Sequence, residues 1–168
     1  MKILFVGGGN MCQAIIGGLV AQGMPIADIH AIEPLAETRA TLERMGVASA
    51  SEFHERDLAV DLIVLAVKPQ MMKIAITPFA GKLAGQLVVS IAAGVRSAEL
   101  AGWLGHTENG HADYRNIVRA MPNTPALIRA GISGLYAMPG VEAGARTAAE
   151  SLLGAVGKTA WFDDEAML

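Results

Sequence analysis

A short apolar run that ends in three glycines opens the chain and restricts what it can fold into. Residues 3–6 are all apolar, which is typical of a parallel strand buried on both faces. The glycines at 7–9 predict a tight turn, and the apolar stretch 11–19 predicts a helix directly after it. A strand, a glycine-rich turn and a helix aim backbone amides and a helix N-terminus at a pyrophosphate. The opening therefore predicts a dinucleotide-binding unit.

Within this turn, Gly7 is expected to make the bend and Gly9 to let the backbone approach the phosphates. Cys12 occupies the third position of the glycine pattern, and it is small enough for the helix and the strand to pack. Glycine-rich turns are common, so a purely structural turn is the alternative interpretation. The position directly after the first strand favours the dinucleotide interpretation.

Glu33 follows about 20 residues after Cys12, at the end of a second predicted strand over 28–33. An acid at this point can accept hydrogen bonds from both ribose hydroxyls of an adenosine. It repels a 2′-phosphate, so Glu33 taken alone favours NADH over NADPH. Arg39, on the next predicted helix, could contact a phosphate if Glu33 turned away. The alternative is a solvated glutamate that ends a strand.

The composition is typical of a single α/β domain without a nucleic-acid partner. A chain of 168 residues is one domain by length, and 52% hydrophobic with 17% charged residues suits a sheet covered on both faces. The formal net charge of −3 provides no basic surface for nucleic acid. Cys12 is the only cysteine, so no intrachain disulfide can form, and we expect a cytoplasmic location. The apolar runs are too short for a signal peptide or a membrane span.

Predicted strands and helices alternate along most of the chain. Strands are expected at 3–6, 28–33, 61–67, 86–91, 115–121, 133–137 and 158–162, and helices at 11–22, 34–45, 51–55, 69–80, 97–104 and 141–153. Ser97 is expected to cap its helix. Repeated strand–helix units predict a doubly wound, mostly parallel α/β sheet of the Rossmann type, with one or two extra strands at its C-terminal edge. The polar stretch 105–113 is expected to form a mobile surface loop.

Three further strand ends carry residues suited to a ligand, because ligands of open α/β sheets bind beyond the carboxyl ends of the strands. Lys68 and Pro69 follow one strand, where the lysine could contact ribose or phosphate oxygens. The small residues 92–94 follow the next, so a flat ring could lie against the backbone. Asn123 and Thr124 follow a third and could meet a carboxamide or a polar substrate. The alternatives are a solvated lysine before a helix, a tight connection and an ordinary turn.

These segments carry a family resemblance. Residues 7–11, 66–70, 90–95, 119–125 and 131–135 resemble, in order and spacing, the successive motifs of pyrroline-5-carboxylate reductase, and the resemblance runs from residue 1 to about residue 165. It implies an oxidoreductase that converts Δ1-pyrroline-5-carboxylate to L-proline with NADPH or NADH, the last step of proline biosynthesis. The residues that we assign to the cofactor are Val6, Gly7, Gly8, Gly9, Asn10, Met11, Glu33, Ala66, Val67, Lys68, Pro69, Ile91, Ala92, Ala93 and Asn123.

Hydride transfer to a cyclic imine requires the nicotinamide C4 to be held against the imine carbon. A protonated imine is already electrophilic, so no strong base is required, and the protein mainly orients the cofactor. The sequence offers no nucleophile triad, carboxylate pair or metal-ligand spacing that we can assign, and we name no catalytic residue. The four histidines, His30, His54, His106 and His111, show no metal-binding pattern.

The resemblance also implies something about the end of the chain. Family members continue past a segment like 162–165 into a helical domain that builds the dimer and carries a substrate loop, whereas this sequence stops at Leu168. We therefore expect a cofactor-binding domain over 1–162, with 163–168 as the start of a missing helical dimerisation domain. Asp164 is the one residue there that we assign to the small imine substrate. The full-length protein is expected to be a homo-oligomer.

Two other kinds of function stay open. A related oxidoreductase of the 6-phosphogluconate dehydrogenase type, or a deazaflavin-linked NADP reductase, could share the first motif. The motifs at 66–70 and 121–125 are not expected together in such a protein. A nucleotide-binding module without catalysis is the other alternative. Nucleic acid and membranes are not expected as partners.

Overall fold

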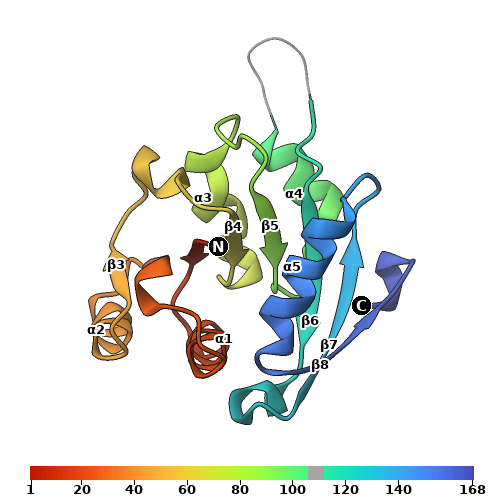
Figure 1. Ribbon diagram of the computed structural model, residues 1–168. Coiled ribbons are helices and arrows are strands. Elements are labelled where there is room, and N and C mark those ends of the chain that lie inside the picture. Colours follow the sequence, from red (N-terminus) through yellow and green to blue (C-terminus); the bar gives the residue numbers. More distant parts are fainter. Residues whose placement is uncertain (106–111) are drawn as a thin grey trace.

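The computed structural model describes residues 1–105 and 112–168, which form one sheet with helices on both faces (Figure 1). Eight strands make up the sheet in the order β3-β2-β1-β4-β5-β6-β7-β8. The predicted doubly wound, mostly parallel sheet with extra strands at its C-terminal edge is confirmed. Most of the stretch 105–113, which the sequence predicts as a surface loop, lies outside the described residues, as do His106 and His111.

The strands are β1 (Ile3–Val6), β2 (Ile29–Ile32), β3 (Ala48–Ala50), β4 (Leu62–Leu65), β5 (Leu87–Ser90), β6 (Ile117–Pro122), β7 (Gly131–Ala137) and β8 (Gly157–Trp161). The α-helices are α1 (Asn10–Ala21), α2 (Ala36–Arg44), α3 (Met72–Ile76), α4 (Ser97–Leu104) and α5 (Ala143–Gly154). The 3-10 helices are η1 (Ile26–Asp28), η2 (Glu55–Leu58), η3 (Pro69–Met71), η4 (Thr77–Phe79), η5 (Thr124–Ile128) and η6 (Glu165–Met167).

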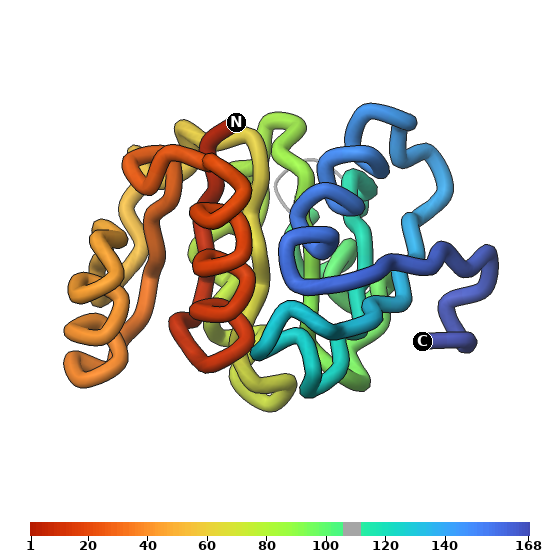
Figure 2. The backbone as a smooth tube through the Cα atoms, turned by 60° about the horizontal axis from the view of Figure 1, so that its bottom comes forward, coloured from red at the N-terminus to blue at the C-terminus, as the bar shows by residue number. Residues whose placement is uncertain are grey.

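Helices α1 and α5 lie side by side on one face of the sheet, and α3 and α4 pack together on the other (Figure 2). Between these layers β1, β4 and β5 are buried along their entire lengths. Their sequences are therefore nearly continuous apolar runs, as expected for parallel strands covered on both faces. No helix in the described ranges is long and apolar enough to cross a membrane.

Strands β1 to β6 are parallel, whereas β7 runs antiparallel to β6, and β8 runs parallel to β7. The reversal at β7 has a local cause. Only residues 123–130 join β6 to β7, and they contain one short 3-10 helix, η5. A parallel crossover needs roughly a dozen residues or more, so this connection can only return the chain in the opposite direction.

Of three local predictions that differ from the structure, two are wrong, and the helical stretch over 69–80 is present but divided. The helix expected at 51–55 is absent, because η2 begins only at Glu55, and the edge strand β3 before it has no clear signal in the sequence. The helix expected over 69–80 is divided into η3, α3 and η4, because Pro69 and Pro78 each lie in the first turn of a new 3-10 helix. Ser97 is the first residue of α4, and Arg96 takes the cap position.

Helices α1 and α5 meet at a glycine. A β-carbon at Gly18 would lie 2.3 Å from the carbonyl oxygen of Ala155, just past the end of α5. A β-carbon at Gly17 would meet no atom within 4 Å. The two glycines are neighbours in one helix, yet only Gly18 is required by the contact between the helices.

Gly18→Ala is expected to destabilise the fold by about 1–3 kcal/mol, because a backbone oxygen cannot move aside without displacing the turn between α5 and β8. Gly17→Ala is the matched control and is expected to stabilise the fold by about 1 kcal/mol, since alanine favours a helix over glycine. Urea unfolding followed by circular dichroism measures both changes. Equal effects of the two substitutions would contradict this packing.

Candidate functional site

The loops after β1 and β4 separate at the edge of the sheet where the parallel strands end. Strand β1 pairs with β2 on one side and with β4 on the other, so the strand order reverses at β1. The amide of Gly7 donates to the carbonyl of Ile32 at 2.8 Å, and the amide of Ala66 donates to the carbonyl of Val6 at 2.8 Å. Ligands of open α/β sheets bind at such a switch point.

The three glycines of the turn have different roles. Gly7 has a φ of +99°, and a β-carbon there would lie 2.7 Å from the carbonyl oxygen of Ala66. A β-carbon at Gly8 would lie 2.8 Å and 3.0 Å from two side chains of α2. A β-carbon at Gly9 would meet no atom within 4 Å. The first two glycines are therefore required by packing, and space for a ligand lies over Gly9.

The N-terminus of α1 faces this space without a cap. Gly9 is the cap residue, no side chain among the described residues accepts a hydrogen bond from the first turn, and no acidic residue lies in that turn. Asn10 is exposed and Met11 is half-buried, so the first amides of the helix are accessible. These amides and the helix dipole favour an anion at this position. The arrangement fits the pyrophosphate of a dinucleotide.

Glu33 follows β2 and holds the glycine turn in place. Its two side-chain oxygens accept hydrogen bonds from the amides of Gly8 and Leu35, each at 2.8 Å. The residue is only 7% exposed, so the alternative of a solvated glutamate at a strand end is wrong. The contact with Gly8 has no signature in the sequence. The expectation that Glu33 accepts ribose hydroxyls stays a prediction.

Arg39 lies beside the same strand end. Its guanidinium donates to the carbonyls of Glu33 and Pro34, at 2.8 Å and 2.7 Å. Both acceptors are neutral, so these contacts leave the positive charge of Arg39 uncancelled. A cation is thus held near the point where the sequence predicts the adenosine ribose.

The loops after β4 and β5 form the other side of the candidate site. Lys68 and Pro69 are exposed after β4, and Pro69 starts η3. After β5, Ala92 is buried, whereas Ala93 is exposed beside Gly94, whose φ is +75°. The exposed tip of this second loop therefore carries no side chain larger than a methyl group.

Asn123 lies at the end of β6 and is exposed. Its side-chain oxygen accepts a hydrogen bond from the amide of Ile132 at 2.9 Å, which closes the connection between β6 and β7. This is the turn role that the sequence leaves open as an alternative. The side-chain NH₂ group of Asn123 makes no hydrogen bond within the described residues, so it can still meet a ligand.

The last residues of the chain return to the sheet beside the loop after β5. Asp164 accepts a hydrogen bond from the amide of Ala166 at 2.9 Å and caps η6. It lines a hollow of about 620 Å³ together with Gly94 and Tyr136. Asp164 is therefore near the predicted nicotinamide loop, and its assignment to a substrate stays a prediction.

Arg119 and Glu165 line the same hollow, and the sequence predicts neither as a site residue. Oε1 of Glu165 lies 3.0 Å from Nη1 of Arg119 and accepts the amide of Ser97 at 2.6 Å. Burial raises the pKa of Glu165, but the Ser97 and Arg119 hydrogen bonds lower it more, so the pKa lies below its ordinary value. The signal in the sequence is an arginine between apolar neighbours at 117–120.

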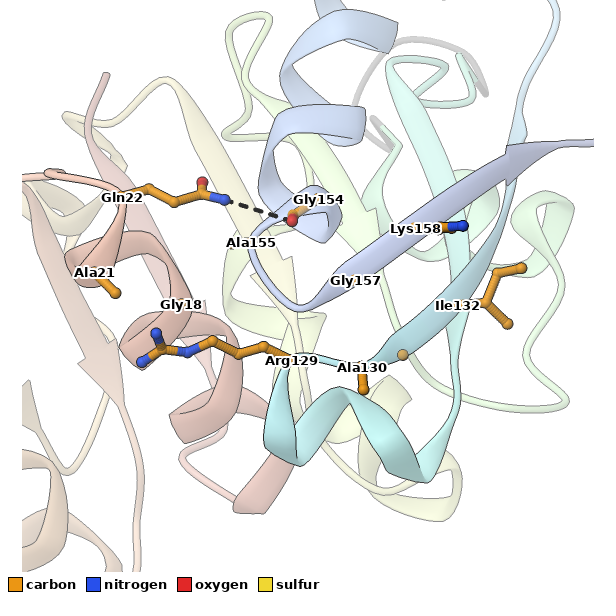
Figure 3. Close-up of a pocket in the computed structure, with 11 residues that line it drawn as sticks. Gly18, Ala21, Gln22, Arg129, Ala130, Ile132, Gly154, Ala155, Gly157 and Lys158 are labelled. Carbon is orange, nitrogen blue, oxygen red and sulfur yellow. Dashed lines mark hydrogen bonds between the residues drawn. The ribbon is translucent and has the colours of Figure 1, made fainter.

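A larger hollow, of about 740 Å³, lies between the end of α1 and the starts of β7 and β8 (Figure 3). Figure 3 shows Arg129 extending toward α1, where it donates to the Gly17 carbonyl at 3.3 Å, and Gln22 extending toward the Gly154 carbonyl at 3.5 Å. The residues that line the hollow include none from the glycine turn or from the loops after β4 and β5. We therefore place the candidate site at the strand ends, where the helix amides are open.

A family model described as NADP oxidoreductase coenzyme F420-dependent matches residues 2–94. That segment contains the glycine turn, Glu33 and the loops after β4 and β5. The chain belongs to this family.

Relatives with known names match nearly the whole chain. The pyrroline-5-carboxylate reductase of Pseudomonas aeruginosa is 46% identical over 169 residues, which is 99% of this chain and 59% of that protein. A solved pyrroline-5-carboxylate reductase from Coxiella burnetii has a TM-score of 0.86 at 35% identity, over 98% of this chain and 59% of that one. The Plasmodium falciparum pyrroline carboxylate reductase solved with NADP bound has a TM-score of 0.78 at 23% identity, over 99% of this chain and 59% of that one.

These comparisons confirm the resemblance that the motifs predict. The chain spans 59% of the length of each of these three relatives.

Glu33→Gln is expected to destabilise the fold by about 1–3 kcal/mol, because the NH₂ group of glutamine cannot accept the Gly8 or the Leu35 amide. Glu37→Gln, at an exposed position in the first turn of α2, is the control and should change stability by no more than about 0.5 kcal/mol. Urea unfolding measures both variants. A Glu33→Gln protein as stable as the control would disprove the anchoring role.

Proposed function

We propose that the chain binds NADPH or NADH across the ends of β1, β2, β4 and β5. The observation that carries this proposal is the uncapped N-terminus of α1 behind Gly9, where a β-carbon would meet no atom within 4 Å. The amides of Gly9, Asn10 and Met11 are assigned to the pyrophosphate, whose charge the helix dipole attracts. Val6 and the first two glycines form the turn that presents these amides.

The two halves of the cofactor are assigned to opposite sides of this turn. Glu33 and Arg39 lie at the end of β2, so they are assigned to the adenosine ribose and its 2′ position. The loops after β4 and β5 are assigned to the second ribose and the nicotinamide. Together with Asn123, these loops contribute Ala66, Val67, Lys68, Pro69, Ile91, Ala92 and Ala93.

Selectivity between NADPH and NADH depends on which group at the end of β2 faces the 2′ position. The Glu33 carboxylate repels a 2′-phosphate, which favours NADH, but both of its oxygens already accept backbone amides. The guanidinium of Arg39 favours a phosphate. Fluorescence titration with each cofactor measures the balance, and clearly tighter binding of NADPH contradicts the preference predicted from Glu33.

We propose further that the whole protein reduces the C=N bond of 1-pyrroline-5-carboxylate to give L-proline. The motifs in register and the relatives of that name, at up to 46% identity, support this assignment. The bound cofactor supplies the hydride from its nicotinamide C4. This chain contributes to the reaction by orienting the cofactor, because the loops after β4 and β5 hold the nicotinamide half. The methyl group of Ala93 is too small to cover the ring.

The same proposal assigns the other parts of the chain. Residues 1–162 are the cofactor-binding domain, and 163–168 lie outside it, with Asp164 beside a small imine substrate. In the whole protein we propose a homo-oligomer and a cytoplasmic location.

Gly9→Ala is expected to weaken NADPH and NADH binding by about tenfold or more, because the new methyl group occupies the space assigned to the pyrophosphate. The fold should lose no more than about 1 kcal/mol, since alanine is a poorer helix cap than glycine but adopts the φ of −66° at Gly9 without strain. Gly17→Ala, the other open glycine, is the matched control and should bind both cofactors normally. Normal binding by Gly9→Ala would place the cofactor elsewhere.

Pyrroline-5-carboxylate reduction is expected from a chimera in which this chain replaces the matching residues of the Pseudomonas aeruginosa reductase. The chain supplies the cofactor side, and the partner protein supplies the remaining 41% of its own length, which this chain does not match. Oxidation of NADPH at 340 nm measures turnover of the chimera and of the chain alone. An inactive chimera that still binds NADPH would contradict the reductase assignment.

A deazaflavin-linked NADP reductase is the second candidate, because the family model that matches residues 2–94 carries that description. Hydride transfer between NADPH and coenzyme F420, assayed with the chain itself, tests this function. Transfer there, together with an inactive chimera, would favour the second candidate.

A further inference from the structure

Glu165 joins three parts of the molecule that lie far apart in the sequence. Its Oε1 accepts the amide of Ser97, the first residue of α4, at 2.6 Å, and lies 3.0 Å from Nη1 of Arg119 in β6. Glu165 itself follows β8, on the dark blue segment at the C-terminal edge of the sheet in Figure 1. A β-carbon at Gly134 of β7 would lie 2.7 Å from the Leu168 side chain, so this segment packs on β7.

The contact between Arg119 and Glu165 is partly buried. The side chain of Arg119 is 5% exposed and that of Glu165 is 19% exposed. Nε of Arg119 is buried and has no acceptor among the described residues, which leaves Glu165 as the charged partner of this guanidinium. Both partners are charged, so this hydrogen bond is stronger than one between neutral groups. The position of the Glu165 carboxylate is therefore set by β6, an inner strand of the sheet.

Through Ser97, Glu165 fixes one end of the loop at 91–96. The other end is fixed by β4, since the amide of Ile91 donates to the carbonyl of Leu65 at 3.1 Å. Between these two points Ala93 and Gly94 are exposed. Glu99 also holds this end, because it accepts the amide of Arg96 at 3.0 Å, and Val95 is buried. Loss of the Ser97 contact would therefore loosen the far end of the loop and leave its start in place.

We propose that Glu165, held by Arg119, is a positioning residue for the nicotinamide, because it sets where the loop at 91–96 lies against the ring. The inference rests on the proposed binding of NAD(P)H. Glu165 acts through the Ser97 amide, and it lies outside the segment 2–94 that the family model matches. Loss of this contact should therefore affect the nicotinamide half of the cofactor and spare the adenosine half.

Ser97→Pro removes the amide donor from the side of the loop, and its ring would take the place of Oε1 of Glu165, so the contact between the loop and Glu165 is lost. Proline suits the first position of a helix, and Arg96 before it is already extended, with a φ of −78° and a ψ of 151°. Ala143→Pro is the matched control, since Ala143 is exposed and is the first residue of α5 after an extended Glu142. Glu165→Ala removes the acceptor itself, since one oxygen of Glu165 accepts from both Ser97 and Arg119.

The readout compares two ligands on the 168-residue chain by calorimetry: NADPH, and 2′-phospho-ADP-ribose, which lacks the nicotinamide. Ser97→Pro and Glu165→Ala are each expected to weaken NADPH binding about fivefold or more and to leave 2′-phospho-ADP-ribose within about twofold of the unaltered chain. Ala143→Pro should bind both ligands normally. Hydrogen exchange of the amides at 92–96 should be faster in the first two variants, which shows the loop directly.

Equal weakening of both ligands, or no change in either, would overturn the positioning role. If the unaltered chain binds neither ligand, the proposed function falls together with the inference. If all variants bind both ligands as the unaltered chain does, the proposed function stands and only the role of Glu165 falls.

Discussion

Strand β1 is hydrogen-bonded on both sides, and the candidate site is arranged around the point where it ends. Val6 is in register with Ile32 of β2 and with Leu65 of β4, so the three strands end level with one another. The chain then has to leave the sheet between two neighbours that still occupy the space beside it. Gly7 makes this exit possible, because it adopts a φ of +99° and has no side chain to collide with the backbone of Ala66. The start of α1 is consequently aimed over the same edge from which the other loops emerge.

The carboxylate of Glu33 is a second group that fixes the shape of the candidate site. By accepting the amides of Gly8 and Leu35, it ties the turn after β1 to the turn after β2 before any ligand is present. Binding sites that are fixed in advance lose less conformational entropy when a ligand arrives. On the other side of β1 the sheet does the same for the loop after β5, whose ends are tied to β4 and, through Glu165, to β6.

The sheet could be predicted from the sequence because β1, β4 and β5 are apolar at nearly every position, and because Gly, Pro and polar residues mark their ends. The predicted strand ends also fall at one edge of the sheet, since all of them follow parallel strands. The roles of Glu33 and Glu165 could not be predicted. Gly8 lies 25 residues from Glu33, and Arg119 lies 46 residues from Glu165. Local patterns carry no information on contacts at such separations. The prediction that Ser97 caps α4 is wrong for a related reason. The amide of Ser97 donates to a glutamate 68 residues away, a contact that no local pattern indicates.

Gly8 has a consequence for how such chains are recognised. Its missing side chain is required by α2, which leaves no room for a β-carbon, and not by the ligand space that lies over Gly9. Selection for a stable fold would therefore preserve Gly7 and Gly8 in a descendant that had stopped binding nucleotides altogether. Two of the three glycines report on the architecture, and Gly9 alone reports on the ligand. A genome survey that scores all three glycines together would therefore count proteins that have lost nucleotide binding as nucleotide-binding proteins.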